Sequence, residues 1–307
     1  MQLYKIREFG DLFSDTFKFL GKYGKHYFVN YLIINGVLTL LMILSMTPLL
    51  SVFFELPSFD AKAGGDFKFL LEENIQLLTA SFAFIFIIAV LISAVTYAFT
   101  PIYFKLLEQK GGINFTTSEL IDALKQHYFK SLKGMIGLFF LSILLSIPLL
   151  IAVLLTACTI IGWLIPVAMF MMLITFTMYE YLTKKENRFF SSFGYAWDLI
   201  TQKSKFWHAS GCVALVILIM GIVQQVISGG LQLGFGLQAQ PEVNGADINF
   251  GAEYWTAMVI LSLAGILIQL ITNIVTYLNM GITFYSLKAE KENISSENTI
   301  DEIGRDI

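Results

Sequence analysis

The chain has 307 residues, of which 56% are hydrophobic and 14% are charged, and its formal net charge is −3. A soluble globular domain carries about 25% charged residues, and the mean hydropathy of +0.70 lies far on the apolar side. The composition therefore excludes an ordinary water-soluble protein. It predicts an all-α integral membrane protein whose solvent is the lipid bilayer.

The first part of the chain predicts an amphipathic helix followed by two membrane spans. Between residues 9 and 20, aromatic and leucine side chains recur on one helical face, and polar side chains occupy the other. A cluster of Lys, His and aromatic residues at 25–28 leads into a predicted span over 28–54, and a second span is expected over 77–104. Each run is long enough to cross about 30 Å of hydrocarbon.

A second amphipathic segment begins at Thr116, where Glu119 three residues later completes a capping box. The run 134–179 that follows contains no charged residue and no histidine. It is too long for one crossing and suits two, so we expect spans over 135–157 and 160–182.

A third amphipathic segment at 190–202 precedes predicted spans over 207–230 and 255–287. The last run is longer than one crossing requires, so we expect it to tilt or to extend past the membrane. The remaining residues, 289–307, form an acidic tail.

The order of amphipathic helix and apolar hairpin predicts a threefold internal repeat within a single domain, 1–288. The three units are 1–104, 116–183 and 189–288. Each amphipathic helix is expected to lie in the cytoplasmic headgroup layer, and the hairpins to be related by a pseudo-rotation along the membrane normal. The alternative is that any six-span protein with cytoplasmic linkers shows such a pattern.

The basic residues predict the orientation. The chain has 20 Lys and Arg, and all except Lys62 and Lys68 fall before the first span, between spans two and three, between spans four and five, or in the tail. This asymmetry predicts cytoplasmic N and C termini. Basic residues beside the spans, with one histidine, are the expected contacts of anionic lipid headgroups: Lys25, His26, Lys130, Lys133, Lys203 and Lys205.

Polar residues inside the spans are the candidate functional sites, because burying them costs free energy unless they are paired. Gln269, Asn273 and Thr276 follow i, i+4, i+7 spacing and form one stripe on a helix. Such a stripe either lines a cavity for a substrate headgroup or joins helices through hydrogen bonds of about 0.6 kcal/mol each. Both roles stay open.

The residues that usually carry chemistry predict no enzyme, cofactor or metal site. His26, His127 and His208 each precede an odd-numbered span, and we interpret them as interface residues; the alternative is a shared zinc site if the three repeats converge. Cys158 and Cys212 lie in apolar runs and read as small buried hydrophobes. HExxH, GxSxG, Walker and GxGxxG motifs are absent from the sequence.

Several short segments resemble a known family. They are Phe-Gly-Asp-Leu-Phe at 9–13, Ser-Phe-Gly-Tyr-Ala-Trp at 192–197, and Tyr-Ser-Leu-Lys-Ala-Glu-Lys-Glu at 285–292. With six spans, they are similar to the membrane domain joined to some bacterial glycerophosphodiester phosphodiesterases, which also exists as stand-alone proteins. The resemblance implies a multi-pass protein of the bacterial inner membrane. It transfers no catalytic residue, because the phosphodiesterase domain has no counterpart here.

Three functional hypotheses follow, and the least supported is a membrane enzyme, because the sequence offers no paired acid, base or nucleophile. The first is a non-enzymatic subunit or scaffold of a larger membrane assembly, including accessory roles in protein translocation or insertion. The second is a carrier of a lipid or small amphiphile through a polar pathway near Gln269 and Asn273. We expect membrane lipids and a membrane protein as partners, and no nucleic acid. Ile300 and Ile303 in the acidic tail are candidate partner contacts.

Overall fold

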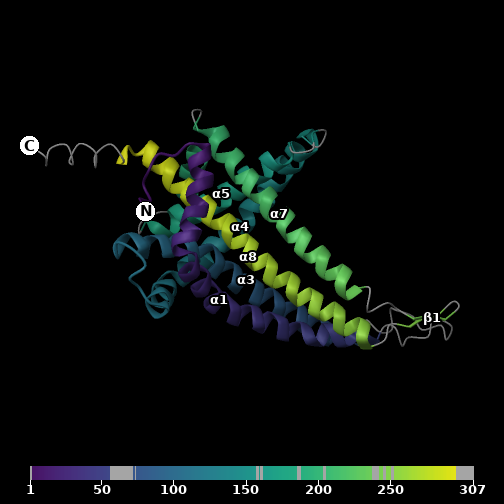
Figure 1. Ribbon diagram of the computed structural model, residues 1–307. Helices are drawn as coiled ribbons and strands as arrows, with labels where there is room; N and C mark the ends of the chain where they lie inside the picture. The colour runs from purple at the N-terminus through teal and green to yellow at the C-terminus, as the bar shows by residue number, and fades with distance from the viewer. Residues whose placement is uncertain are drawn as a thin grey trace, which may run out of the picture. The chain divides into compact units, whose positions relative to one another are not determined.

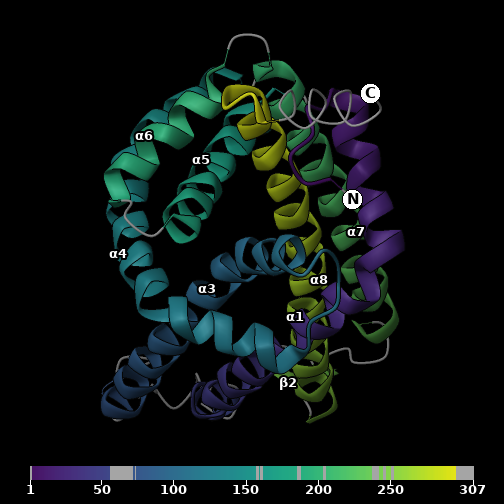
Figure 2. The same cartoon turned by 90° about the vertical axis from the view of Figure 1, so that its left-hand side faces the viewer.

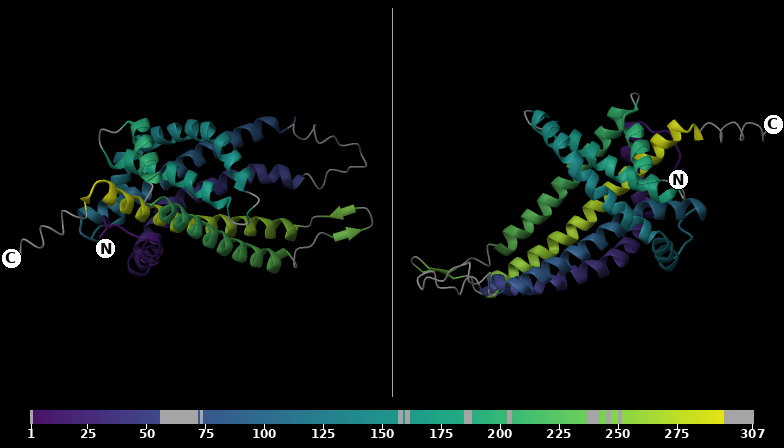
Figure 3. Two further views of the ribbon diagram at one scale, coloured as in Figure 1. Left: turned by 90° about the horizontal axis from the view of Figure 1, so that it is seen from above. Right: turned by 180° about the vertical axis from the view of Figure 1, so that it is seen from behind.

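The computed structural model describes residues 2–55, 72, 74–156, 159, 162–184, 188–202, 205–236, 242–244, 247–249 and 252–294. Within these ranges the fold is all-α apart from one short hairpin (Figure 1). The helices are α1 (Phe9–Glu55), α3 (Ile75–Gln109), α4 (Thr117–Thr156), α5 (Leu164–Thr183), α6 (Phe189–Ile200), α7 (Phe206–Gly236) and α8 (Ala252–Lys291). The strands β1 (Glu242–Asn244) and β2 (Asp247–Asn249) pair antiparallel, with Val243 opposite Ile248 (Figure 3).

Six helices in the described part of the chain are long and apolar enough to cross a membrane, which confirms the predicted six spans. Several are much longer than one crossing. With a rise of about 1.5 Å per residue, the 40 residues of α4 or of α8 extend about 60 Å, twice the thickness of the hydrocarbon. Each therefore contains a span together with an extension.

The amphipathic segments take two different forms. The first and second are the N-terminal parts of α1 and α4 and continue into the spans without a break, and Figure 2 shows that α4 curves along its length. No proline interrupts the chain between residues 9 and 47 or between 117 and 147, so the backbone hydrogen bonds can continue. Only the third segment is a separate helix, α6.

The chain divides into two compact units. Unit 1 comprises Met1–Ile34, Ser93–Gly221 and Asn273–Ile307, and unit 2 comprises Asn35–Ile92 and Ile222–Thr272. The helices α1, α3, α7 and α8 therefore contribute residues to both units. The threefold repeat stays a prediction.

Helix α5 is the centre of unit 1. All residues from Met172 to Glu180 are buried, and a run of that length points in every direction around a helix. Other helices must therefore enclose α5 on all sides. Figure 2 shows it between α6 and α8, and Phe176 of α5 packs edge-on against Phe284 of α8.

Aromatic rings fill the rest of this core between α1 and α3. Tyr27 packs edge-on against Phe99 and Tyr103, with ring centroids 5.3 and 4.8 Å apart. Such pairs contribute about 0.5–1.5 kcal/mol beyond simple burial. The Tyr27 hydroxyl lies 2.9 Å from the Thr100 hydroxyl, so its polar end is also satisfied.

Unit 2 exposes a strongly apolar surface. In α3, Phe82, Phe84, Phe86 and Ile87 are each more than half exposed. Exposed apolar residues at that density are typical of lipid-facing spans rather than of a soluble surface. Inside unit 2, the Thr272 hydroxyl lies 3.5 Å from the side-chain oxygen of Gln224 and links α8 to α7.

Gly281 is a point of close approach between α8 and its neighbours in unit 1. A Cβ atom at this position would lie 2.5 Å from the Tyr179 hydroxyl oxygen and 2.6 Å from a ring carbon of Phe104. Both neighbours are fully buried and cannot move aside easily. Glycine is required here by packing against α5 and α3.

We expect Gly281→Ala to lower the thermal unfolding temperature of the purified protein in detergent, because overpacking a core costs about 1–3 kcal/mol. Gly265→Ala in the same helix is the matched control. A Cβ atom there meets nothing within 4 Å, so the gain in helix propensity should leave the unfolding temperature unchanged or higher. Equal effects of the two substitutions would contradict this account of α8 packing.

Candidate functional site

The three residues of the predicted polar stripe on α8 differ in their exposure. Gln269 and Asn273 are exposed, whereas Thr276 is buried with 8% of its surface accessible. The spacing correctly places the three residues on one side of the helix, but their surroundings differ. Thr276 belongs to the packed part of α8, and only the two amides remain available to a ligand or partner.

The side of α8 opposite Gln269 and Asn273 is apolar and is also exposed. Leu267 is 50% exposed and Ile271 is 45% exposed. Two residues correspond to about 200° around a helix, so these side chains point away from Gln269 and Asn273. This part of α8 therefore has two exposed sides, one apolar and one carrying amides.

The candidate headgroup contacts differ in their exposure. Lys25 and Lys133 are exposed, and Lys205 is half-buried. Lys203 lies outside the described residues, as do the candidate partner contacts Ile300 and Ile303. The exposed ammonium groups of Lys25 in α1 and Lys133 in α4 are accessible to lipid phosphates.

His26 and Lys130 point into the protein instead. The ring nitrogens of His26 lie 2.9 Å from the Tyr103 hydroxyl and 3.1 Å from the Phe115 carbonyl oxygen. The Lys130 ammonium donates to the Lys184 carbonyl at the end of α5 and lies 5.0 Å from the centre of the Tyr181 ring. Both side chains connect helices, which makes them poor contacts for lipid.

The three histidines do not form a metal site. His127 bonds to the Ala123 carbonyl of its own helix, and His208 is exposed. In the part of the chain that the structure describes, no three His, Cys, Asp or Glu side chains are grouped as metal ligands. Cys212 is buried, as the sequence predicts, while Cys158 lies outside the described residues.

A buried charge cluster joins α5 to α8 and was not evident from the sequence. The Glu180 side chain is 1% exposed, and its two carboxylate oxygens lie 2.7 Å from the Lys184 ammonium and 3.1 Å from the Lys288 ammonium. The Lys288 side chain is itself only 8% exposed. The carboxylate is therefore paired with one ammonium from the end of its own helix and one from α8.

Helix α6 is attached to the same cluster through Tyr195. The hydroxyl of Tyr195 donates to a carboxylate oxygen of Glu292 at 2.7 Å, and the ammonium groups of Lys184 and Lys291 lie 5.0 and 4.5 Å from its ring centre. Burial, followed by the hydrogen bond to Glu292, raises the pKa of Tyr195. The hydrogen bond to Glu180 raises the pKa of Lys184. Both groups therefore keep their protons at neutral pH.

The N-terminal segment is fixed to the end of α8. The backbone N–H of Arg7 donates to the Ser286 hydroxyl, and the Arg7 guanidinium forms an ion pair of 2.9 Å with Asp15. The same guanidinium donates to the carbonyl oxygens of Gln2 and Leu3. Since every part of the Arg7 side chain is engaged, residues 2–7 are held against the helices of unit 1.

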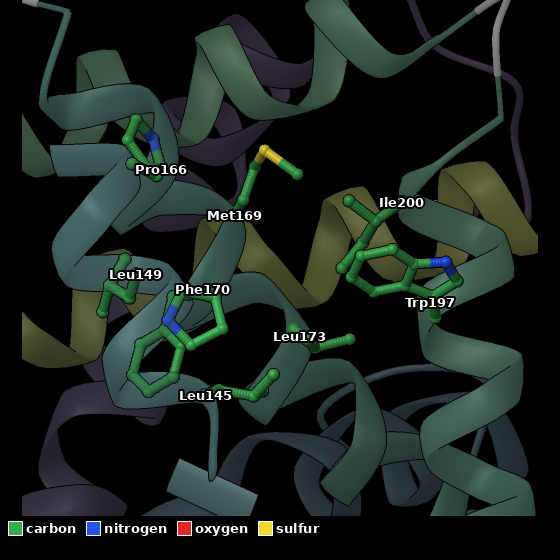
Figure 4. A pocket seen from close by; sticks show the side chains of 10 residues that line it. Leu145, Leu149, Pro166, Met169, Phe170, Leu173, Trp197 and Ile200 are labelled. Carbon is green, nitrogen blue, oxygen red and sulfur yellow. The ribbon is translucent and has the colours of Figure 1, made fainter. Parts of the chain in front are cut away.

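An apolar pocket lies between α4, α5 and α6 in unit 1 (Figure 4). Its volume is about 220 Å³, below the roughly 300 Å³ at which pockets for drug-sized ligands begin. Trp197 and Ile200 of α6 face Met169 and Leu173 of α5 across it (Figure 4). The described residues that line it are apolar and include no charged side chain.

No family model, curated protein or solved structure matches the chain. The resemblance to the phosphodiesterase membrane domain therefore stays a prediction.

We expect Glu180→Gln to destabilise the protein by about 3 kcal/mol, because it leaves the Lys288 ammonium buried without a carboxylate. The free energy of unfolding in detergent measures the loss. Asp198→Asn is the matched control, since the ion pair of Asp198 with Lys291 is exposed and should contribute less than about 1 kcal/mol.

A double variant, Glu180→Gln with Lys288→Met, separates loss of the ion pair from an unpaired charge. It removes the buried ammonium as well, so it should be more stable than Glu180→Gln alone. If Glu180→Gln costs no more than Asp198→Asn, the cluster does not hold α5 to α8.

Proposed function

We propose that the protein is a non-enzymatic subunit of a larger assembly in the bacterial inner membrane, with both termini in the cytoplasm. It binds another membrane protein through the side of α8 that carries Gln269 and Asn273. This proposal rests on the observation that the two amides are exposed on one side of α8, whereas Leu267 and Ile271 are exposed on the opposite side. The apolar side suits lipid, and the amide side suits protein.

The free-energy cost of placing an amide in lipid favours a partner protein over the amide side of α8. Moving an amide from water into hydrocarbon without a hydrogen-bond partner costs about 4–8 kcal/mol of free energy. A hydrogen bond between helices within a membrane contributes about 0.6 kcal/mol on average. The penalty for facing lipid is much the larger quantity, so Gln269 and Asn273 require polar surroundings.

The packing of unit 1 supports a scaffold. A carrier that exposes its site alternately to the two sides must move helices past one another. Such movement between α5 and α8 would separate Glu180 from Lys288 and disturb the tight contact at Gly281. Both interactions favour a single arrangement of these helices.

The second candidate function is a lipid carrier, which the apolar pocket beside α6 favours. In that account an acyl chain lies among Leu149, Phe170 and Trp197, and the amide side of α8 borders a water-filled pathway. A carrier therefore predicts water at Gln269, whereas a subunit predicts protein there.

A photoreactive residue introduced singly at four positions of α8 tests the proposal. We expect crosslinks in intact cells from positions 269 and 273 to one protein, identified by mass spectrometry and recovered in stoichiometric amounts. Positions 267 and 271 are the matched controls and should crosslink to lipid, because they lie on the apolar side.

Cysteine variants at the same four positions distinguish the two functions. If Gln269→Cys reacts with a membrane-impermeant thiol reagent and position 269 gives no protein crosslink, the subunit proposal fails and the carrier is favoured. Protection at position 269 together with a protein crosslink supports the subunit.

A further inference from the structure

A second pocket lies within unit 1 where α3 ends. Its volume is about 230 Å³, and its wall includes Tyr4, Tyr23, Glu108, Gly111 and Gly112. Unlike the pocket beside α6, it combines a carboxylate with two phenol rings. Gly111 has φ of +65°, in the left-handed region that favours glycine, and the turn it forms brings the backbone beside Glu108.

The carboxylate of Glu108 is available. Among the described residues, no ion pair or side-chain hydrogen bond occupies it. The nearby Lys110 is engaged with Glu119 at 2.8 Å. Lys288 attracts Glu108 from a distance, but Glu180 already neutralises that ammonium at 3.1 Å.

The electrostatics of the pocket favour a cation. Glu108 lies in the last turn of α3, which contains no basic residue, and the C-terminal end of a helix attracts positive charge. Burial, and then the charges of Glu108, Glu292 and Glu180, raise the pKa of Tyr4 to about 12. The Tyr4 hydroxyl therefore stays neutral and lies in a negative field.

The aromatic wall suits an ammonium group in particular. The ammonium of Lys22 lies 5.0 Å from the centre of the Tyr23 ring, so this ring already accepts a cation on one face. An ammonium held over a tyrosine face gains about 0.5–1 kcal/mol at an exposed site. One carboxylate is too few to hold a divalent metal ion, and it would repel an anion.

We propose that this pocket, lined by Glu108, Tyr4 and Tyr23, binds the ammonium group of a primary alkylamine. The carboxylate supplies the ion pair, and the tyrosine rings supply the cation–π contact. Such an ammonium is presented by an ethanolamine lipid headgroup or by a free amine. The pocket lies on the basic side of the spans, where both sources are accessible.

The lipid source is tested with the full chain in nanodiscs that contain equal amounts of phosphatidylethanolamine and phosphatidylglycerol. Native mass spectrometry should show preferential retention of phosphatidylethanolamine by the wild type. Glu108→Gln should reduce that preference about tenfold, because a hydrogen bond to a charged group is lost. Glu119→Gln is the matched control, since Glu119 is on the same side but pairs with Lys110, and it should retain the preference.

The free-amine source is tested by equilibrium dialysis of radiolabelled ethanolamine against the same variants in phosphatidylglycerol nanodiscs. Saturable binding by the wild type and by Glu119→Gln, weakened about tenfold in Glu108→Gln, supports a soluble amine. Circular dichroism and gel filtration verify that each variant is folded. If neither arm shows binding that depends on Glu108, the proposal is wrong.

Discussion

The carboxylate of Glu180 lies between the ammonium groups of Lys184 and Lys288, and the arrangement of unit 1 depends on that neutralisation. A buried carboxylate without partners costs several kcal/mol. Lys184 comes from the end of α5 itself, whereas Lys288 comes from α8 and is buried. Because the buried Lys288 ammonium needs the Glu180 carboxylate, this pair holds α8 against α5, and Tyr195 brings α6 to the same place.

The rest of α8 has the opposite character. Beyond the tightly packed region at Gly281, it exposes Gln269 and Asn273 on one side and Leu267 and Ile271 on the other. One end of α8 is thus tightly packed, and the part of the helix beyond it has an exposed polar side. A partner protein that covers this side would keep the two amides out of lipid.

The six spans could be predicted from the sequence because length and hydropathy are local properties. The exposure of Gln269 and the burial of Thr276 could not, since helical spacing places them on one side regardless of what packs there. The role of Glu180 could not be predicted from the sequence for a similar reason. Beside Lys184 it resembles an ordinary interface residue, and its partner Lys288 lies 108 residues away. His26 likewise looks interfacial until Tyr103 and Phe115 are placed around it.

The proposed subunit function requires that another protein covers the amide side of α8. A cryo-electron microscopy map of the protein extracted with its native membrane into polymer nanodiscs tests this most directly. We expect helical density of a second protein against Gln269 and Asn273, and lipid density against Leu267 and Ile271. Lipid chains or open solvent on both sides would show that no protein partner covers the amides.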